Sequence, residues 1–170
     1  MRNPTFLIAA AAAMASAPAA AVTPDQNAGG KGLILVPLSL TKLSDLDFGS
    51  LVPSSVSGFV SIDAASGARS VGGGVTGVPS AVGNRAYFGG AGSPNQTVIV
   101  TMNSPTALTS TTNTVDKIPV LALTIEGSAV KTVDPTTRTF FFGVGGVIQV
   151  NANQPEGVYQ ATFDVTANYL

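Results

Sequence analysis

The stretch Gly157–Leu170, GVYQATFDVTANYL, decides the fold of this 170-residue chain. Apolar or aromatic side chains occupy every second position, and polar side chains occupy the positions between them. A period of two is typical of an amphipathic β-strand with one buried face. The apolar positions are Tyr159, Ala161, Phe163, Val165, Ala167 and Tyr169. Because the pattern continues to the last residues, we expect a sheet to hold this strand up to its end.

Other segments carry a similar signal. Valine, threonine, isoleucine and phenylalanine gather in short runs that glycine, proline, serine and asparagine separate. Such runs are typical of strands joined by turns, and helical periodicity is absent after residue 21. The predicted strands are 34–41, 46–52, 58–64, 96–102, 119–127, 137–142, 145–150 and 157–170. Seven or so strands at this spacing predict an all-β sandwich of two sheets, without fixing the strand order.

Two stretches lack this patterning. Ser66–Gly92 is rich in glycine, and Ser104–Asn113 is rich in serine and threonine. Long connections in a compact domain are either functional or mobile. Because charged and aromatic anchors are scarce in both stretches, we expect mobile surface loops.

The N-terminal segment has the features of an export signal. Arg2 supplies a positive charge, residues 6–14 (FLIAAAAAM) form a short apolar run, and small residues at 19–21 suit a cleavage site. The sequence therefore predicts a signal peptide over 1–21, an N-terminal extension over 22–32 and a β-sandwich domain over 33–170. We expect an exported protein.

Composition excludes several functional classes. The chain has 8 basic and 9 acidic residues, which form no cluster of one sign, so we expect no nucleic-acid partner. It has no cysteine and no histidine, which are the commonest ligands of transition metals and common catalytic groups. We therefore predict no catalytic residues, no metal site and no cofactor, and we expect that the protein is not an enzyme.

Two short motifs do not alter that expectation. Asp47-Phe48-Gly49 matches the metal-binding tripeptide of protein kinases, but the other kinase motifs are missing. We predict that Phe48 packs in the core and that Gly49 permits a bend. Asp45 and Asp47 could share one face of a strand, but with no further ligand nearby they indicate a solvated surface.

The chain's two ends carry a family resemblance. Gly157 is fourteenth from the C-terminus and Tyr169 is penultimate, with apolar residues alternating between them. This pattern resembles the C-terminal β-zipper of chaperone–usher pilus subunits. The stretches 37–40, 45–49 and 146–169 are similar to the bacterial family of domain of unknown function 4402, which is related to the spore coat protein U domain.

The resemblance implies an immunoglobulin-like sandwich that lacks one strand. A periplasmic chaperone would fill the resulting groove first, and the N-terminal extension of another copy or a related subunit would replace it at an outer-membrane usher. Such head-to-tail contacts build a fibre by donor-strand complementation. The destination is then the cell surface or a fimbrium, reached through the periplasm. The implied groove strand comprises Gly157, Tyr159, Ala161, Phe163, Val165, Ala167 and Tyr169.

The donor segment is less clearly marked. Residues 22–32 are mostly polar, whereas pilin donors alternate bulky apolar residues. The possible donor residues are Gly30, Gly32, Ile34 and Val36. Alternatively, the N-terminal segment pairs within its own chain. The protein would then be a self-contained secreted binding module or adhesin that uses the stretch 66–92, in which Tyr87 and Phe88 are the aromatic residues.

Overall fold

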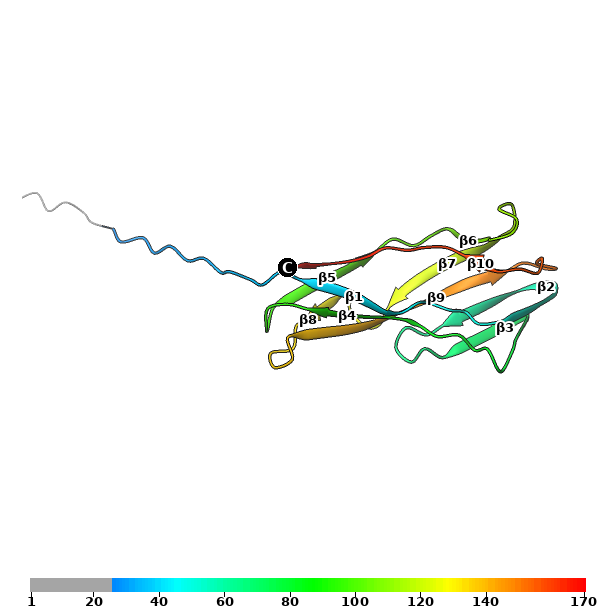
Figure 1. Ribbon diagram of the computed structural model, residues 1–170, viewed down its shortest axis with the longest axis horizontal. Coiled ribbons are helices and arrows are strands. Elements are labelled where there is room, and N and C mark those ends of the chain that lie inside the picture. The colour runs from blue at the N-terminus through cyan, green and yellow to red at the C-terminus, as the bar shows by residue number, and fades with distance from the viewer. Residues whose placement is uncertain (1–25) are drawn as a thin grey trace, which may run out of the picture. The chain divides into compact units, whose positions relative to one another are not determined.

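The computed structural model describes residues 26–170 (Figure 1). The predicted signal peptide, 1–21, and the start of the predicted extension lie outside the described residues. The chain divides after Leu33, and the unit from Ile34 to Leu170 contains the strands. Residues 26–33 have no regular secondary structure.

The described residues form eleven strands and no helix. The bounds are β1 Ser39–Ser44, β2 Leu51–Ile62, β3 Arg69–Gly77, β4 Ala86–Ala91, β5 Thr97–Met102, β6 Ala107–Ser110, β7 Lys117–Ile125, β8 Val130–Thr132, β9 Thr139–Val150, β10 Tyr159–Gln160 and β11 Val165–Tyr169. The fold is all-β, as the alternating patterns predict, with more strands than the seven or so expected.

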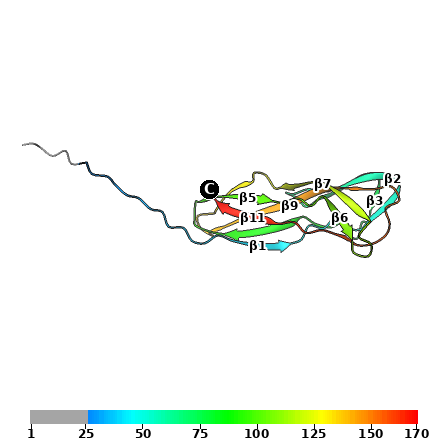
Figure 2. The same ribbon diagram turned by 90° about the horizontal axis from the view of Figure 1, so that it is seen from above.

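The strands form two antiparallel sheets. The larger sheet has eight strands, with the order β1-β4-β9-β7-β6-β10 and with β2 and β3 attached beside β9. The smaller sheet has the order β11-β5-β8. Strand β9 organises the larger sheet: its first half pairs with β4, its second half pairs with β2, and β7 lies along its other edge. Figure 2 shows β11 beside β1, which belongs to the other sheet.

The two sheets face each other through a shared core. Val98 and Val100 of β5 pack in one cluster with Phe88 of β4 and Phe142 of β9, and all four side chains are buried. A second cluster lies beneath the other half of the larger sheet and contains Phe48, Val60, Ile62, Val75, Ile118, Ile148 and Val150. The arrangement is sandwich-like, because the apolar faces of the strands lie between the two layers.

Several predicted strands are confirmed. The stretch 96–102 forms β5, and 119–127 corresponds to β7. The stretches 137–142 and 145–150 form the single strand β9, because Gly143 continues the pairing with Tyr87 of β4. Regular structure begins only at Ser39 within the first predicted strand, and 157–170 contains two short strands, β10 and β11.

The predicted loops are the main error. Ser66–Gly92 contains β3 and β4, and Ser104–Asn113 contains β6. Glycines 72–74 hide the alternation of β3, since residues without side chains reveal neither face of a strand. Strand β4 does alternate, with Ala86, Phe88 and Gly90 buried. Only Leu51 and Val52 of the predicted strand 46–52 lie in β2, and the predicted strand 58–64 forms its other half as far as Ile62. The register of β2 shifts between Pro53 and Gly58.

Candidate binding groove

A long groove of about 1260 Å³ opens between two segments that are far apart in the sequence. One wall is Lys42–Pro53, and the other is Gln154–Phe163. Strands β4, β6, β7 and β9 supply the floor, which is almost entirely apolar. Its residues are Ala86, Phe88, Leu108, Ile118, Val120, Leu123, Ile148 and Val150. The floor thus exposes the edge of the second core cluster to the groove.

The first wall is shaped by a tight turn. Gly49 has a φ of 73°, and its N–H donates a hydrogen bond of 2.8 Å to the carboxylate of Asp47. This turn points the ring of Phe48 into the core, where it is 8% exposed. The backbone of Asp47 exchanges hydrogen bonds with Asn84, which does not line the groove. The predictions of a buried Phe48 and a bend at Gly49 are confirmed.

Hydrogen bonds hold the second wall against β6, and hold the strand that follows it, β11, against β5. Tyr159 and Gln160 pair with β6, and β11 continues along β5. Asn103 donates to the carbonyl of Asp164, and Leu170 donates to that of Thr97. Because bonded and non-bonded positions alternate in an antiparallel pair, the backbone groups of Val165, Ala167 and Tyr169 point away from β5. Val165, Ala167 and Tyr169 therefore pack their side chains against the core and also carry the backbone groups that β5 does not bond.

The walls join only beyond the ends of the groove. At one end the N–H of Asn153 donates to the carbonyl of Ser54 over 2.7 Å. At the other end the hydroxyl of Tyr169 donates to the carbonyl of Val36 over 2.9 Å. Within residues 34–170 no hydrogen bond links the two walls between these points. The facing backbone edges of the two walls are therefore partly unpaired along the groove.

A buried polar atom faces this region without a partner. Gln154 lines the groove and is 8% exposed, and its amide nitrogen donates to the hydroxyl of Tyr159 over 3.0 Å. Its Oε1 atom has no hydrogen-bond partner among the described residues. Burial of an unpaired carbonyl oxygen is unfavourable, so a bound segment that supplies an N–H would stabilise it.

A profile of one protein family matches residues 38–169, which include both walls and the whole floor. This family is a domain of unknown function, DUF4402. The chain belongs to the DUF4402 family. Searches of curated proteins and of solved structures found no match. The matched residues include 45–49, 146–169 and all of 37–40 except Pro37, which are the stretches that carry the sequence resemblance.

The structure brings together the residues predicted for the groove strand of this DUF4402 domain. Gly157, Tyr159, Ala161 and Phe163 line the groove. Val165, Ala167 and Tyr169 continue the same face and pack against the first core cluster. Most of the alternate side chains from Tyr159 to Tyr169 are half-buried, but Ala161 is exposed. The inner face of the strand is therefore only partly covered.

The predicted donor residues are largely exposed. A Cβ atom placed on Gly30 or Gly32 would have no neighbour within 4 Å. Ile34 is 96% exposed, and Val36 is 47% exposed. Leu33, beside them, is 70% exposed. The chain thus carries a bulky apolar segment at 33–36, in which Leu33, Ile34 and Val36 are exposed and Leu35 is half-buried, as well as an apolar groove.

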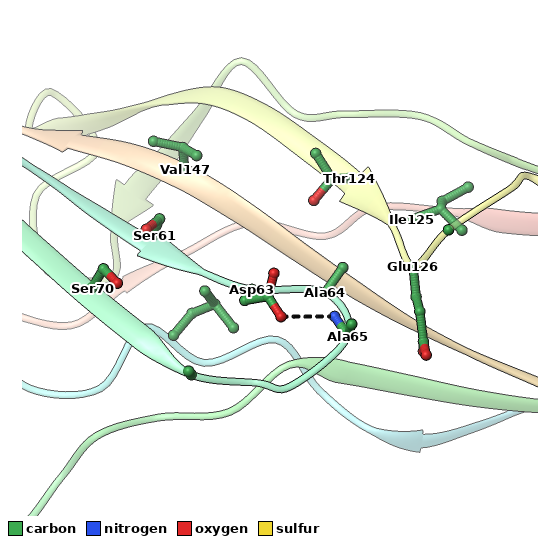
Figure 3. A pocket seen from close by; sticks show the side chains of 12 residues that line it. Ser61, Asp63, Ala64, Ala65, Ser70, Thr124, Ile125, Glu126 and Val147 are labelled. Carbon is green, nitrogen blue, oxygen red and sulfur yellow. Dashed lines mark hydrogen bonds between the residues drawn. The ribbon is translucent and has the colours of Figure 1, made fainter.

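A second, smaller cavity of about 490 Å³ lies at the ends of β2 and β7 (Figure 3). It contains two carboxylates, and both already have partners. The hydroxyl and the N–H of Ser66 donate to Asp63, and these bonds hold the pKa of the Asp63 carboxyl below its ordinary value. Glu126 accepts from the N–H of Gly143 at 2.8 Å and from Arg85 at 3.2 Å. These contacts indicate a structural network.

The described residues contain no group of three or more side chains arranged to hold a metal ion. Asp45 is exposed and pairs with Lys42, and Asp47 binds the backbone of its own turn. Both aspartates therefore lie on the solvated surface, as their sequence context indicates. A search of residues 26–170 for a helix long and apolar enough to cross a membrane found none.

Proposed function

We propose that this DUF4402 protein is an exported structural subunit of a bacterial surface fibre. The groove takes an extended segment of another copy, which completes the sandwich as an additional strand. The observation that carries this proposal is an apolar groove whose two walls have partly unpaired backbone edges. An extended segment would supply backbone hydrogen bonds to the edges and side chains to the floor, which is recognition by β-augmentation.

The apolar segment 33–36, which is exposed except at Leu35, supports the same proposal. It gives the chain both halves of a head-to-tail joint, and such a joint does not close on itself but propagates as a fibre. Each bulky side chain buried in the groove would contribute roughly 1.5–3 kcal/mol. An empty groove is an aggregation hazard, so a periplasmic chaperone would cover it during export and an outer-membrane usher would receive the complex. The role is structural, without catalysis, and the domain corresponds to an immunoglobulin-like sandwich that lacks one strand.

Electrophoresis of the mature protein without boiling tests this function. We expect a ladder of detergent-resistant oligomers that collapses to monomer on boiling, and we expect the ladder to vanish when residues 22–35 are deleted. A sharp monomer band for the full mature chain would contradict the proposal.

A matched pair of variants locates the joint. Ala161 is exposed within the groove, so Ala161→Arg should leave the fold intact and place a charge where the incoming segment lies. We expect this variant to abolish the ladder. Asn168→Arg introduces the same charge at an exposed, polar position of β11, outside the groove, and we expect it to retain the ladder. Equal behaviour of the two variants would exclude the groove as the joint.

A second candidate function is adhesion by a self-contained domain. Tyr87 and Phe141 stack on the larger sheet with ring centroids 6.0 Å apart, and Phe141 is 51% exposed. The guanidinium of Arg85 lies 4.7 Å from the centre of the Tyr87 ring. Exposed aromatic rings with polar neighbours suit the stacking of a sugar ring. Titration with oligosaccharides, with Phe141→Ala as the comparison, tests this candidate, and the absence of binding would remove it.

A further inference from the structure

Three residues hold the chain at the point where it enters the domain. The N–H of Val36 donates to the hydroxyl of Ser93 over 2.9 Å, and the carbonyl of Val36 accepts from the hydroxyl of Tyr169 over 2.9 Å. The same Tyr169 hydroxyl accepts from the N–H of Ser93 over 2.7 Å. We call Val36, Ser93 and Tyr169 the clamp. Both backbone groups of Val36 are thus bonded inside its own domain.

The surroundings of the clamp are fitted to the Tyr169 hydroxyl. A Cβ atom on Gly92 would lie 2.5 Å from that hydroxyl and 2.8 Å from Leu38 Cδ1, so a side chain at position 92 would displace the Tyr169 ring or Leu38. Ser93 is 8% exposed, so its N–H and its hydroxyl form their hydrogen bonds largely out of contact with water. The clamp is therefore a hydrogen-bonded contact between β11 and the start of the domain, in which Ser93 is buried and Val36 is partly exposed.

The position of the clamp limits what the apolar run can reach. The groove begins at Lys42 on one wall and at Phe163 on the other. Lys42 is six positions from Val36, and Phe163 is six positions from Tyr169, which is about 20 Å of extended chain in each case. Ile34 is two positions from Val36, so its Cα lies within about 7 Å of the clamp, and Leu33 lies within about 11 Å. Neither residue reaches its own groove while Val36 is held.

The residues that are far enough from Val36 to reach the groove are mostly polar or small, whereas the groove floor is apolar. Gly30 is the first residue far enough from Val36 to reach the groove, and the residues before it, 22–29, read VTPDQNAG. They offer few apolar side chains for an apolar floor. Filling the groove from within the same chain would therefore leave most of that floor without an apolar partner.

We propose that the clamp prevents the chain from filling its own groove and reserves the apolar arm Leu33–Leu35 for the groove of a second copy. This inference rests on the proposed function, and it explains why the groove binds the arm of a second copy rather than the N-terminal segment of its own chain. The clamp acts by disfavouring the intramolecular alternative, so its contribution is to specificity rather than to the strength of the joint.

Engineered disulfides test this inference, because the chain has no cysteine of its own. Ala161 is exposed and lines the groove two residues beyond its start at Phe163, so Ala161→Cys supplies an acceptor thiol that the arm can reach from Ser39 once the clamp is lost. Leu33→Cys and Ile34→Cys, each tested separately, cover the two faces of an extended arm. Val115→Cys, at an 82% exposed position, replaces the arm cysteine in the control. A disulfide requires Cα atoms within about 7 Å, so the product reports which groove the arm occupies.

With the clamp intact, we expect disulfide-linked dimers and higher oligomers on a non-reducing gel, with a yield that falls on dilution. With Tyr169→Phe and Ser93→Ala combined, we expect an intramolecular disulfide in the monomer, with a yield independent of concentration. Tyr87→Phe removes a hydroxyl elsewhere and should behave as the unmodified clamp. Hydrogen exchange checks the clamp directly, since its loss should reduce protection of the Val36 N–H by roughly tenfold.

Two results would overturn the inference while leaving the joint in place. One is an intramolecular disulfide as the main product when the clamp is intact. The other is an unchanged ladder without intramolecular product when the clamp is removed, with urea denaturation showing that the variant is folded. Absence of a disulfide in every background would instead overturn the proposed function, and the clamp's role with it. Ser93→Ala alone removes one hydrogen bond and keeps the test valid if the double variant fails to fold.

Discussion

The ring of Phe163 meets the ring of Phe88 edge to face, with centroids 6.5 Å apart and planes inclined by 71°. Phe88 stacks in turn on Phe142, which is fully buried. Both Phe88 and Phe163 also line the groove. This contact therefore marks where the closed core between the two sheets ends and the open groove begins.

Replacement of Phe163 should destabilise the domain moderately. Its ring is half-buried, and Phe163→Ala removes its edge-to-face contact with Phe88. We expect the free energy of unfolding to fall by roughly 2 kcal/mol, less than for a fully buried phenylalanine. Urea denaturation of a monomeric form measures the change, with Phe163→Leu as the milder comparison. A loss as large as that caused by Phe142→Ala would show that the groove is closed in solution.

A side chain at position 145 should be poorly tolerated. Gly145 lies in β9 beside β2, and a Cβ atom there would collide with the backbone of Ile62 and Ala64. Because backbone atoms cannot move aside as a side chain does, Gly145→Ala should cost roughly 1–3 kcal/mol. A Cβ at Gly72 has no neighbour within 4 Å, so Gly72→Ala is the matched control and should change stability little. Thermal unfolding of the two variants gives the comparison, and equal stabilities would refute the predicted collision.

Two aspartate turns should make stability depend on acid. Hydrogen bonds from Ser66 lower the pKa of Asp63, and hydrogen bonds from Thr137 and Thr136 lower that of Asp134. A lowered pKa in the folded state means that these carboxylates stabilise the fold above about pH 4, and that this contribution is lost as the pH falls further. We expect Asp63→Asn and Asp134→Asn each to reduce the loss in the free energy of unfolding that acidification below about pH 4 causes, as measured by urea denaturation at several pH values.

The control for these turns is Asp164→Asn, whose carboxylate has no hydrogen bond within residues 34–170. It should leave this acid-induced loss unchanged. Because the chain has no histidine, we also expect stability to vary little between pH 5 and 8. A steep dependence in that range would contradict the expectation.

Loss of the Arg85 side chain should lower the free energy of unfolding by more than loss of its ion pair with Glu126. Its Nη1 atom donates to the carbonyls of Ala64 and Ala65 as well as to Glu126. Arg85→Ala leaves those carbonyls without this donor, and we expect a loss of about 1–3 kcal/mol. Glu126→Gln keeps an oxygen for the N–H of Gly143, and the pair is partly exposed, so we expect a loss below about 1 kcal/mol. Denaturation of both single variants and the double variant measures the coupling, and equal single losses would contradict this ranking.

Local sequence predicted much of the framework. The alternation in β5 and β7 is visible because their apolar and polar side chains differ clearly, and the prediction that Phe48 is buried beside a bend at Gly49 follows from residue chemistry alone. Periodicity does not predict strand β3, because glycines carry no side chain to show a face. It predicts two strands in place of β9, because Gly143 is typical of a turn, although its backbone continues the ladder with β4.

The groove shows the limit of sequence reasoning. The sequence alone predicts the apolar face of Tyr159–Tyr169, because a period of two determines which side chains share a face of an extended chain. The opposite wall, Lys42–Pro53, lies more than a hundred residues away, and only the pairing of the strands brings it across the floor. The clamp likewise joins Val36 to Ser93 and Tyr169. Periodicity is a local property, and it determined the amphipathic strand at 157–170. The tertiary structure decided which strands pair with it, because pairing joins residues that are far apart in the sequence. It also left the side of the strand that faces Lys42–Pro53 open as the groove.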